Sequence, residues 1–313
     1  MKPPPLISPA SHVTVAFSGA GHLLAYHLGV ASVLHQYYCK GSNGSASSPG
    51  ESNSCRTFPP IHAVSGSSSG AIAAAILACM PHRLQEYTDR FIGDRGRGFF
   101  HLREMILEEE EIIKQQRGQK HEDLELYVCV TKSEDGSPHL FPFPNHSASS
   151  FDGERLLQAI EASCRIPVSF HPLDLLKTIV SYEEEGIEIN GTFYVDGGLS
   201  GVFPPPCPMD MDTTQQSHRI LVCPLSIGRV LAINELSGKS QFVISPGHGA
   251  TPSSNWSLMM KARDGMSIKP TVKNLQNLVA AAGFTSSEAL LDWNNRAKED
   301  AELFIASYLE DNL

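Results

Sequence analysis

Long apolar runs are missing from this sequence. Nowhere in its 313 residues do about 20 apolar residues follow one another, as a membrane-spanning helix requires. The opening residues, MKPPPLISPA, contain three consecutive prolines where a signal peptide would need an uninterrupted apolar helix. We therefore expect a soluble, cytoplasmic protein.

Cysteine pairs with the spacing of a disulfide framework or a zinc site are also missing. The seven cysteines are odd in number, scattered along the chain and never arranged as C-x-x-C. We expect reduced, mostly buried thiols, no metal and no cofactor. The four consecutive glutamates at 108–111 do not change this expectation, because adjacent carboxylates on a helix point in diverging directions and usually form a solvated face.

A long basic stripe is absent as well, and the formal net charge is −10. A general nucleic-acid binder neutralises phosphates with lysine and arginine, so we expect no nucleic-acid partner. The hydrophobic content of 41% and charged content of 19% are those of a folded globular chain.

Strand patterns and helix patterns alternate along the chain. Predicted strands cover residues 12–17, 61–65, 124–130 and 218–226, and predicted helices cover residues 22–38, 71–80, 81–91, 99–116 and 151–164, with two more between 270 and 313. Asp152 stands at the N-cap position of one helix, and Asn190-Gly191 joins the arms of a hairpin. The alternation indicates an α/β fold with a mainly parallel sheet, helices on both faces, and binding sites beyond the carboxyl ends of the strands.

One segment differs in composition from the rest. Residues 41–54, GSNGSASSPGESNS, contain no large apolar residue, so nothing there offsets the entropy cost of ordering. We expect a disordered loop at about 41–56 inside a domain of residues 12–225. Residues 226–313 are expected to form a C-terminal loop and helical extension that packs on the same domain.

SGSSSG, at residues 65–70, looks like a flexible linker but lies between two apolar stretches, IHAV and AIAAAILACM. Gly66, Ser68 and Gly70 form a G-x-S-x-G pattern. In a strand-to-helix turn this pattern forces the central serine into a strained conformation, and the glycines remove Cβ atoms that would clash. Ser68 would then stand at the amino end of a helix, whose partial positive charge favours an alkoxide-like nucleophile. A plain Ser/Gly turn explains the five letters equally well.

A second turn of small residues, Ser18-Gly19-Ala20-Gly21, directly follows the first predicted strand. The backbone N–H groups of Gly19, Ala20 and Gly21 can gather at a helix N-terminus and bind a phosphate or an oxyanion. A dinucleotide-binding loop is the rival interpretation. It would need glycine where this chain has Leu24, and no fitting acidic residue follows a second strand.

The third motif, Asp196-Gly197-Gly198, ends the second arm of the predicted hairpin. An aspartate followed by Gly197 and Gly198 can be approached closely and can act as a base, although D-G-G is also an ordinary turn sequence.

Four histidines are further candidate site residues. His218 and His248 follow Asp196 and would complete the order serine, acid, histidine of an α/β-hydrolase, but neither has a supporting motif, so we expect surface or loop positions. His22 and His27 lie next to the glycine turn, where contact with a substrate is one interpretation, and a position on the helix surface is the expected one.

The three motifs occur in the order oxyanion loop, serine, aspartate, and this order resembles the patatin-like phospholipase family. FSGAGHLLAYHLGVASVL is similar to the animal-type members. ASCRIPVSFHP resembles the stretch before the catalytic aspartate, and GTFYVDGGLSGVFP matches the segment that contains it. The resemblance spans roughly Val13 to Cys223.

The resemblance implies a patatin-like three-layer fold and a lipid acyl hydrolase that works through an acyl-enzyme. Ser68 would be the nucleophile and Asp196 the base of a dyad that needs neither histidine nor a metal. The substrate would be a glycerolipid or phospholipid, met at the surface of a membrane or lipid droplet.

The chain departs from the family's bacterial and plant pattern, G-G-G-x-[RK]-G, at three positions. Ala20 replaces the middle glycine, Leu23 the basic residue and Leu24 the last glycine. A missing positive charge can weaken the stabilisation of developing negative charge. Two alternatives therefore stay open: a weakly active or inactive lipid-surface binding protein of the same fold, and a transacylase.

Overall fold

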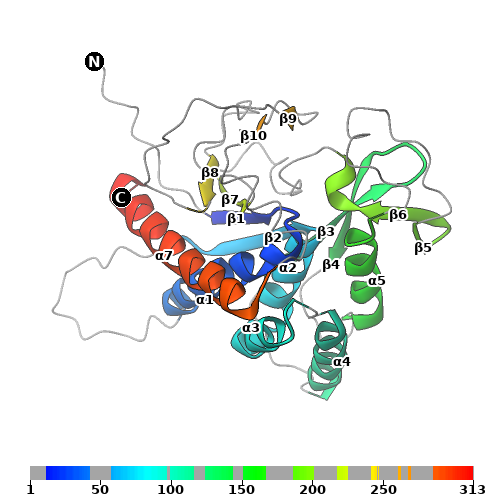
Figure 1. Cartoon of the computed structure of the whole chain (residues 1–313), viewed down its shortest axis with the longest axis horizontal. Coiled ribbons are helices and arrows are strands. Elements are labelled where there is room, and N and C mark those ends of the chain that lie inside the picture. Colours follow the sequence, from blue (N-terminus) through cyan, green and yellow to red (C-terminus); the bar gives the residue numbers. More distant parts are fainter. Residues whose placement is uncertain are drawn as a thin grey trace.

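The core of the protein is a mainly parallel sheet (Figure 1). The computed structural model describes residues 12–42, 58–96, 99–115, 124–143, 151–166, 186–200, 217–224, 241–244, 246, 260–261, 267–268 and 285–312. The strands of the sheet that pair in parallel are β1 (His12–Phe17), β2 (Ile61–Ser67), β3 (Glu125–Lys132), β7 (Ser217–Val222) and β8 (Gln241–Ile244). The strands β4 (Pro138–Phe143), β5 (Ile187–Ile189) and β6 (Thr192–Asp196) join antiparallel, and β9 (Met260–Lys261) pairs with β10 (Ser267–Ile268) in a separate ladder. The sheet order is β5-β6-β3-β2-β1-β7-β8, with β4 on β3, and the expected fold class is confirmed.

Helices pack around this sheet. They are α1 (Leu24–Ser42), α2 (Ser69–Cys79), α3 (Leu84–Gly93), α4 (Phe99–Gln115), α5 (Gly153–Ser163) and α7 (Ser287–Asn312), with short 3₁₀ turns at Gly21–Leu23, Pro81–Arg83 and Gly197–Ser200. In Figure 1, α1, α2, α3 and α7 lie together, while α5 covers β3, β5 and β6. Within the described residues, no helix has both the length and the apolar character needed to cross a bilayer.

Local sequence signals account for several element boundaries. Asn190 and Gly191 have φ angles of 52° and 78°, the left-handed pair that a tight hairpin turn requires. The Asp152 carboxylate accepts the Arg155 N–H at 2.9 Å and so caps α5. Both predictions are confirmed, and the hairpin carries Asp196 to the end of β6.

Strand β4 was not predicted. Pro138 and Pro142 lie within it, and proline normally argues against a strand because it has no N–H to donate. Strand β8 was also missed. The first of the two helices predicted between residues 270 and 313 and most of the loop predicted at about 41–56 lie outside the described residues.

The C-terminal helix α7 packs directly on α1. A Cβ atom on Gly29 would lie 2.4 Å from the Asn294 carbonyl oxygen and 2.7 Å from the Ala297 Cβ, so only glycine allows this approach. The buried Tyr26 hydroxyl donates to Asp300 at 2.9 Å. The amide of Asn294 donates to the Ala25 carbonyl at 2.9 Å. These contacts attach the C-terminal helix to the helix that follows the glycine turn; the division at residue 225 stays a prediction.

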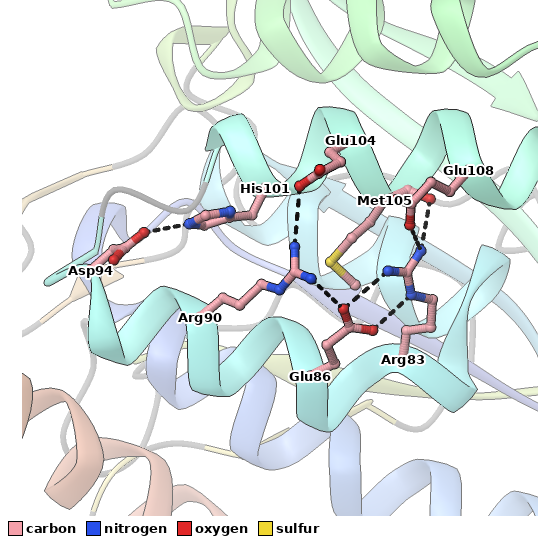
Figure 2. A network of polar contacts seen from close by, with 8 residues as sticks. All are labelled: Arg83, Glu86, Arg90, Asp94, His101, Glu104, Met105 and Glu108. Carbon is pink, nitrogen blue, oxygen red and sulfur yellow. Dashed lines mark hydrogen bonds and ion pairs between the residues drawn. The ribbon is translucent and has the colours of Figure 1, made fainter.

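Helices α3 and α4 are joined by the network of charged groups in Figure 2. Arg83 forms ion pairs with Glu86 and Glu108, each at 2.8 Å. Arg90 forms ion pairs with Glu86 at 2.7 Å and with Glu104 at 3.2 Å. Of the four consecutive glutamates, Glu108 belongs to this network. Glu108 and Glu111 are exposed, as expected.

Glu109 corrects that expectation. Its side chain is buried, 3.4 Å from His82 Nε2, because this position of α4 faces inward.

Candidate active site

The register of the sheet brings the predicted serine and aspartate together. Ser67, the last residue of β2, lies opposite Cys129 on β3. Asp196, the last residue of β6, lies opposite Val130, the next residue along β3. Because β2 runs parallel to β3 and β6 runs antiparallel to it, both carboxyl ends stop at the same point. Ser68 and Asp196, which are 128 positions apart in the chain, thus lie near one another at the ends of the two strands that flank β3.

Ser68 occupies a strained turn between β2 and α2. Its φ of 53° and ψ of −131° are unusual for a residue with a side chain. The flanking glycines are sterically required: a Cβ on Gly66 would lie 2.2 Å from the Gly70 carbonyl oxygen, and one on Gly70 would lie 2.3 Å from the Phe17 carbonyl oxygen. The stretch is therefore a tight elbow and not a linker. Ser68 is partly exposed and immediately precedes the first residue of α2, where the helix dipole is positive.

The close approach at Gly70 gives a stability prediction. Gly70→Ala is expected to lower the free energy of unfolding by about 3 kcal/mol, because the new methyl group meets the backbone carbonyls of Phe17 and Ser18, which cannot move independently of β1. Gly93→Ala in α3 is the matched control, since a Cβ there meets nothing within 4 Å. Denaturant unfolding of the two variants measures the difference, and equal midpoints would contradict the proposed tightness of the elbow.

Asp196 is buried, and one of its two carboxylate oxygens has no hydrogen-bond partner among the described residues. It is 5% exposed, and its Oδ1 accepts the Gly198 N–H at 2.8 Å. Its backbone carbonyl accepts from the Thr131 hydroxyl at 2.8 Å, and its own N–H donates to the Arg165 carbonyl at 2.9 Å. Oδ2 has no hydrogen-bond partner among the described residues. This oxygen is therefore available to accept a proton.

Burial raises the pKa of the Asp196 carboxyl to about 6, and the Ser68 side chain and the Gly198 N–H oppose that rise. The Ser68 hydroxyl is thus near enough to influence Asp196 without meeting the geometry of a hydrogen bond to Oδ2. A carboxylate with a pKa close to neutral pH is suited to general-base work, because it is ionised at rest yet accepts a proton readily. Gly197 is also sterically required, since a Cβ there would lie 2.2 Å from the Cys129 carbonyl oxygen.

The glycine turn after β1 lies against the elbow. A Cβ on Gly19 would be 3.1 Å from the Ser68 Cβ, so the turn borders the serine directly. The Ala20 N–H donates to the Ser69 hydroxyl at 3.0 Å and so fixes the turn to the first residue of α2. Its predicted role as an oxyanion donor stays a prediction. The Gly19 and Gly21 N–H groups have no acceptor among the described residues, and Gly21 has a φ of 52°. They are the remaining candidate donors.

The sequence predicts His27 on the helix surface, and this prediction is wrong. The side chain is completely buried beneath the glycine turn. Burial lowers its pKa to about 3, so the ring is neutral and Nε2 donates to the Ser18 carbonyl at 2.7 Å. Leu23 and Leu24, which replace polar or glycine positions of the family pattern, are also buried in the core. Their apolar character follows from packing against the helices around them.

Two further candidate histidines are separated from Ser68 and Asp196 or lie outside the described part of the chain. His218 pairs with Val13 near the start of β1, whereas the elbow and glycine turn lie at the opposite end of that strand. His248 is outside the described residues. The thiols of Cys79, Cys129 and Cys223 are buried, as expected, and that of Cys164 is partly buried. The described residues contain no group of His, Cys, Asp and Glu that could hold a metal ion.

The chain was compared with known protein families, curated proteins and solved structures. A human protein, patatin-like phospholipase domain-containing protein 4, is 22% identical over 240 residues, which cover 73% of each chain. Among solved structures, VipD from Legionella pneumophila has 12% identity and a TM-score of 0.36, covering 91% of this chain and 67% of that one. The ExoU–SpcU complex of Pseudomonas aeruginosa has 13% identity and a TM-score of 0.37; the match covers 95% of this chain and 52% of that one. The family model of the patatin-like phospholipases matches residues 15–205, more than half of the chain, and the protein therefore belongs to the patatin-like phospholipase family.

Proposed function

We propose that this protein is a lipid acyl hydrolase that uses Ser68 as nucleophile and Asp196 as general base. The single observation that carries the proposal is the meeting of a strained, partly exposed serine with a buried carboxylate that has an unpartnered oxygen. Strain at Ser68 is costly for folding and is explained if it serves to present the hydroxyl. Membership of the patatin-like phospholipase family supports lipid hydrolysis in general.

The chemistry divides into acylation and deacylation. Ser68 Oγ attacks the ester carbonyl carbon while Asp196 Oδ2 takes the hydroxyl proton, and the N–H groups of Gly19 and Gly21 stabilise the oxyanion. Collapse of the intermediate expels the alcohol, which receives the proton from Asp196. Water then attacks the acyl-enzyme with Asp196 again as base, so that fatty acid is released and Ser68 is restored.

The proposed substrates are glycerolipids or phospholipids at the surface of a membrane or lipid droplet. This chemistry needs an ester carbonyl and a water molecule, and no metal or organic cofactor takes part in it. The protein would take its substrate directly from this surface, because lipids with long acyl chains are scarcely soluble as single molecules in water.

Covalent labelling tests the assignment of the nucleophile. A fluorophosphonate probe is expected to modify the full-length protein at one site, identified as Ser68 by peptide mass spectrometry, and to leave Ser68→Ala unmodified. A panel of phospholipid, galactolipid, lysolipid and triacylglycerol then identifies the substrate class by released fatty acid. Absence of labelling on a folded protein that still co-sediments with liposomes would instead favour the lipid-surface binding role. Acyl transfer to added glycerolipid acceptors in excess of hydrolysis would identify a transacylase.

A further inference from the structure

One buried serine connects the two halves of the candidate site. Ser163 is the last residue of α5 and is fully buried. Its hydroxyl oxygen accepts the backbone N–H of Ser68 at 2.8 Å, and its hydroxyl proton goes to the Cys129 carbonyl at 2.6 Å. A single hydroxyl group thus links the nucleophile's backbone to strand β3.

The carbonyl that Ser163 contacts also borders the aspartate's turn. Gly197 lies so close to the Cys129 carbonyl oxygen that a Cβ there would be 2.2 Å away. Two residues after Ser163, the Arg165 carbonyl accepts the Asp196 N–H at 2.9 Å. The C-terminal end of α5 therefore contacts the backbone of both Ser68 and Asp196, which no other described helix does through such hydrogen bonds.

The Ser68 N–H has a particular need for this acceptor. Ser68 has left the ladder between β2 and β3, whose pairing ends at Ser67 and Cys129. Ser68 has a φ of 53°, and its N–H is beyond the end of this pairing. Without another acceptor this N–H would be unsatisfied, which would destabilise the conformation. A hydroxyl can accept this bond and donate a second one at the same time, which neither alanine nor an amide N–H can do.

From these contacts we propose that Ser163 is a positioning residue for catalysis: it holds the Ser68 backbone in the strained conformation that presents Oγ to Asp196. The inference rests on the proposed function, because it assumes that Ser68 is the nucleophile. Ser163 does not touch the substrate in this scheme; it acts only through the Ser68 backbone. Its effect should therefore fall on the rate of the chemical step and not on substrate binding.

The test uses full-length protein, a soluble nitrophenyl ester and a fluorophosphonate probe, so that lipid-surface binding does not enter the measurement. Ser163→Ala removes the acceptor, and Ser163→Cys replaces the hydroxyl with a slightly larger thiol that is a weaker acceptor and donor. Thr88→Val is the matched control, because the Thr88 hydroxyl makes a similar buried bond, at 2.7 Å to the Leu84 carbonyl, inside α3. Ser68→Ala gives the background rate.

We expect Ser163→Ala to lower kcat and the labelling rate constant by about 10-fold to 100-fold, as small misplacements of reacting groups do, with KM changed less than about 2-fold. Ser163→Cys should fall between wild type and alanine. Thr88→Val should lose comparable thermal stability and keep its kcat.

The possible contrary results are distinct. If folded Ser163→Ala reacts at the wild-type rate, or loses no more rate than Thr88→Val at equal thermal stability, Ser163 has no positioning role. If neither Ser163 variant folds, the residue is required for folding and the inference is wrong. If wild type reacts no faster than Ser68→Ala, the proposed function fails and this inference fails with it.

Discussion

Ser68→Ala is expected to lower ester hydrolysis by at least about 1,000-fold in kcat, because alanine has no hydroxyl with which to form the acyl-enzyme. The fold should be retained, since the methyl group of alanine remains compatible with a turn whose tight contacts are made by Gly66 and Gly70. Fatty acid release from vesicles and nitrophenyl ester hydrolysis both measure the loss. Residual activity reflects only the oxyanion donors and substrate binding.

The matched control for this variant is Ser65→Ala, in the same SGSSSG stretch. The Ser65 hydroxyl is buried in β2 and has no hydrogen-bond partner among the described residues, so its removal should leave kcat and stability nearly unchanged. A Ser68→Ala protein that hydrolyses esters at the rate of Ser65→Ala would show that the reaction uses another nucleophile.

The elbow illustrates how far sequence reasoning reaches. The five letters from Gly66 to Gly70 could not distinguish a flexible turn from a strained one, and the apolar stretches on both sides favoured the elbow. The structure adds the physical cause, which is the approach of Gly70 to the carbonyls of Phe17 and Ser18 at the end of β1. Local signals also predicted the hairpin at Asn190-Gly191, because left-handed turns restrict residue type strongly.

Features that depend on distant pairing were not predictable. The neutral, buried state of His27 depends on the turn that folds over it, and Glu109 is buried through the packing of α4. The link from Ser163 to Ser68 joins residues 95 positions apart, and nothing in the local pattern of α5 marks its last serine. The only available signal was the ASCRIP stretch, which the family resemblance identified without assigning it a role.

Asp196→Asn is the second change with a large expected effect, a loss of about 1,000-fold or more in kcat, because asparagine cannot take the Ser68 proton. The wild-type profile should show the same group: kcat/KM is expected to rise with pH up to about 6 and to level off above it, since the base acts when ionised. Asp135→Asn is the control; this exposed aspartate accepts the Ser137 N–H in a turn away from the site. A wild-type profile that is flat between pH 5 and 7 would argue against Asp196 as the base.

The same substitution should raise stability while it removes activity. Burial lifts the pKa of Asp196 from 3.8 in the unfolded chain to about 6 in the folded one. Between those values the unfolded chain carries fewer protons, so the free energy of unfolding falls as pH rises from about 4 to about 6, by on the order of 3 kcal/mol. Asp196→Asn removes this dependence, and because Oδ1 of asparagine can still accept the Gly198 N–H, the variant should gain stability at pH 7 up to that amount. Denaturant unfolding at pH 4 and pH 7 measures both effects. A variant that is less stable than wild type at pH 7 would show that the charged carboxylate stabilises the fold, and the strain and desolvation at this site would then need an explanation other than catalysis.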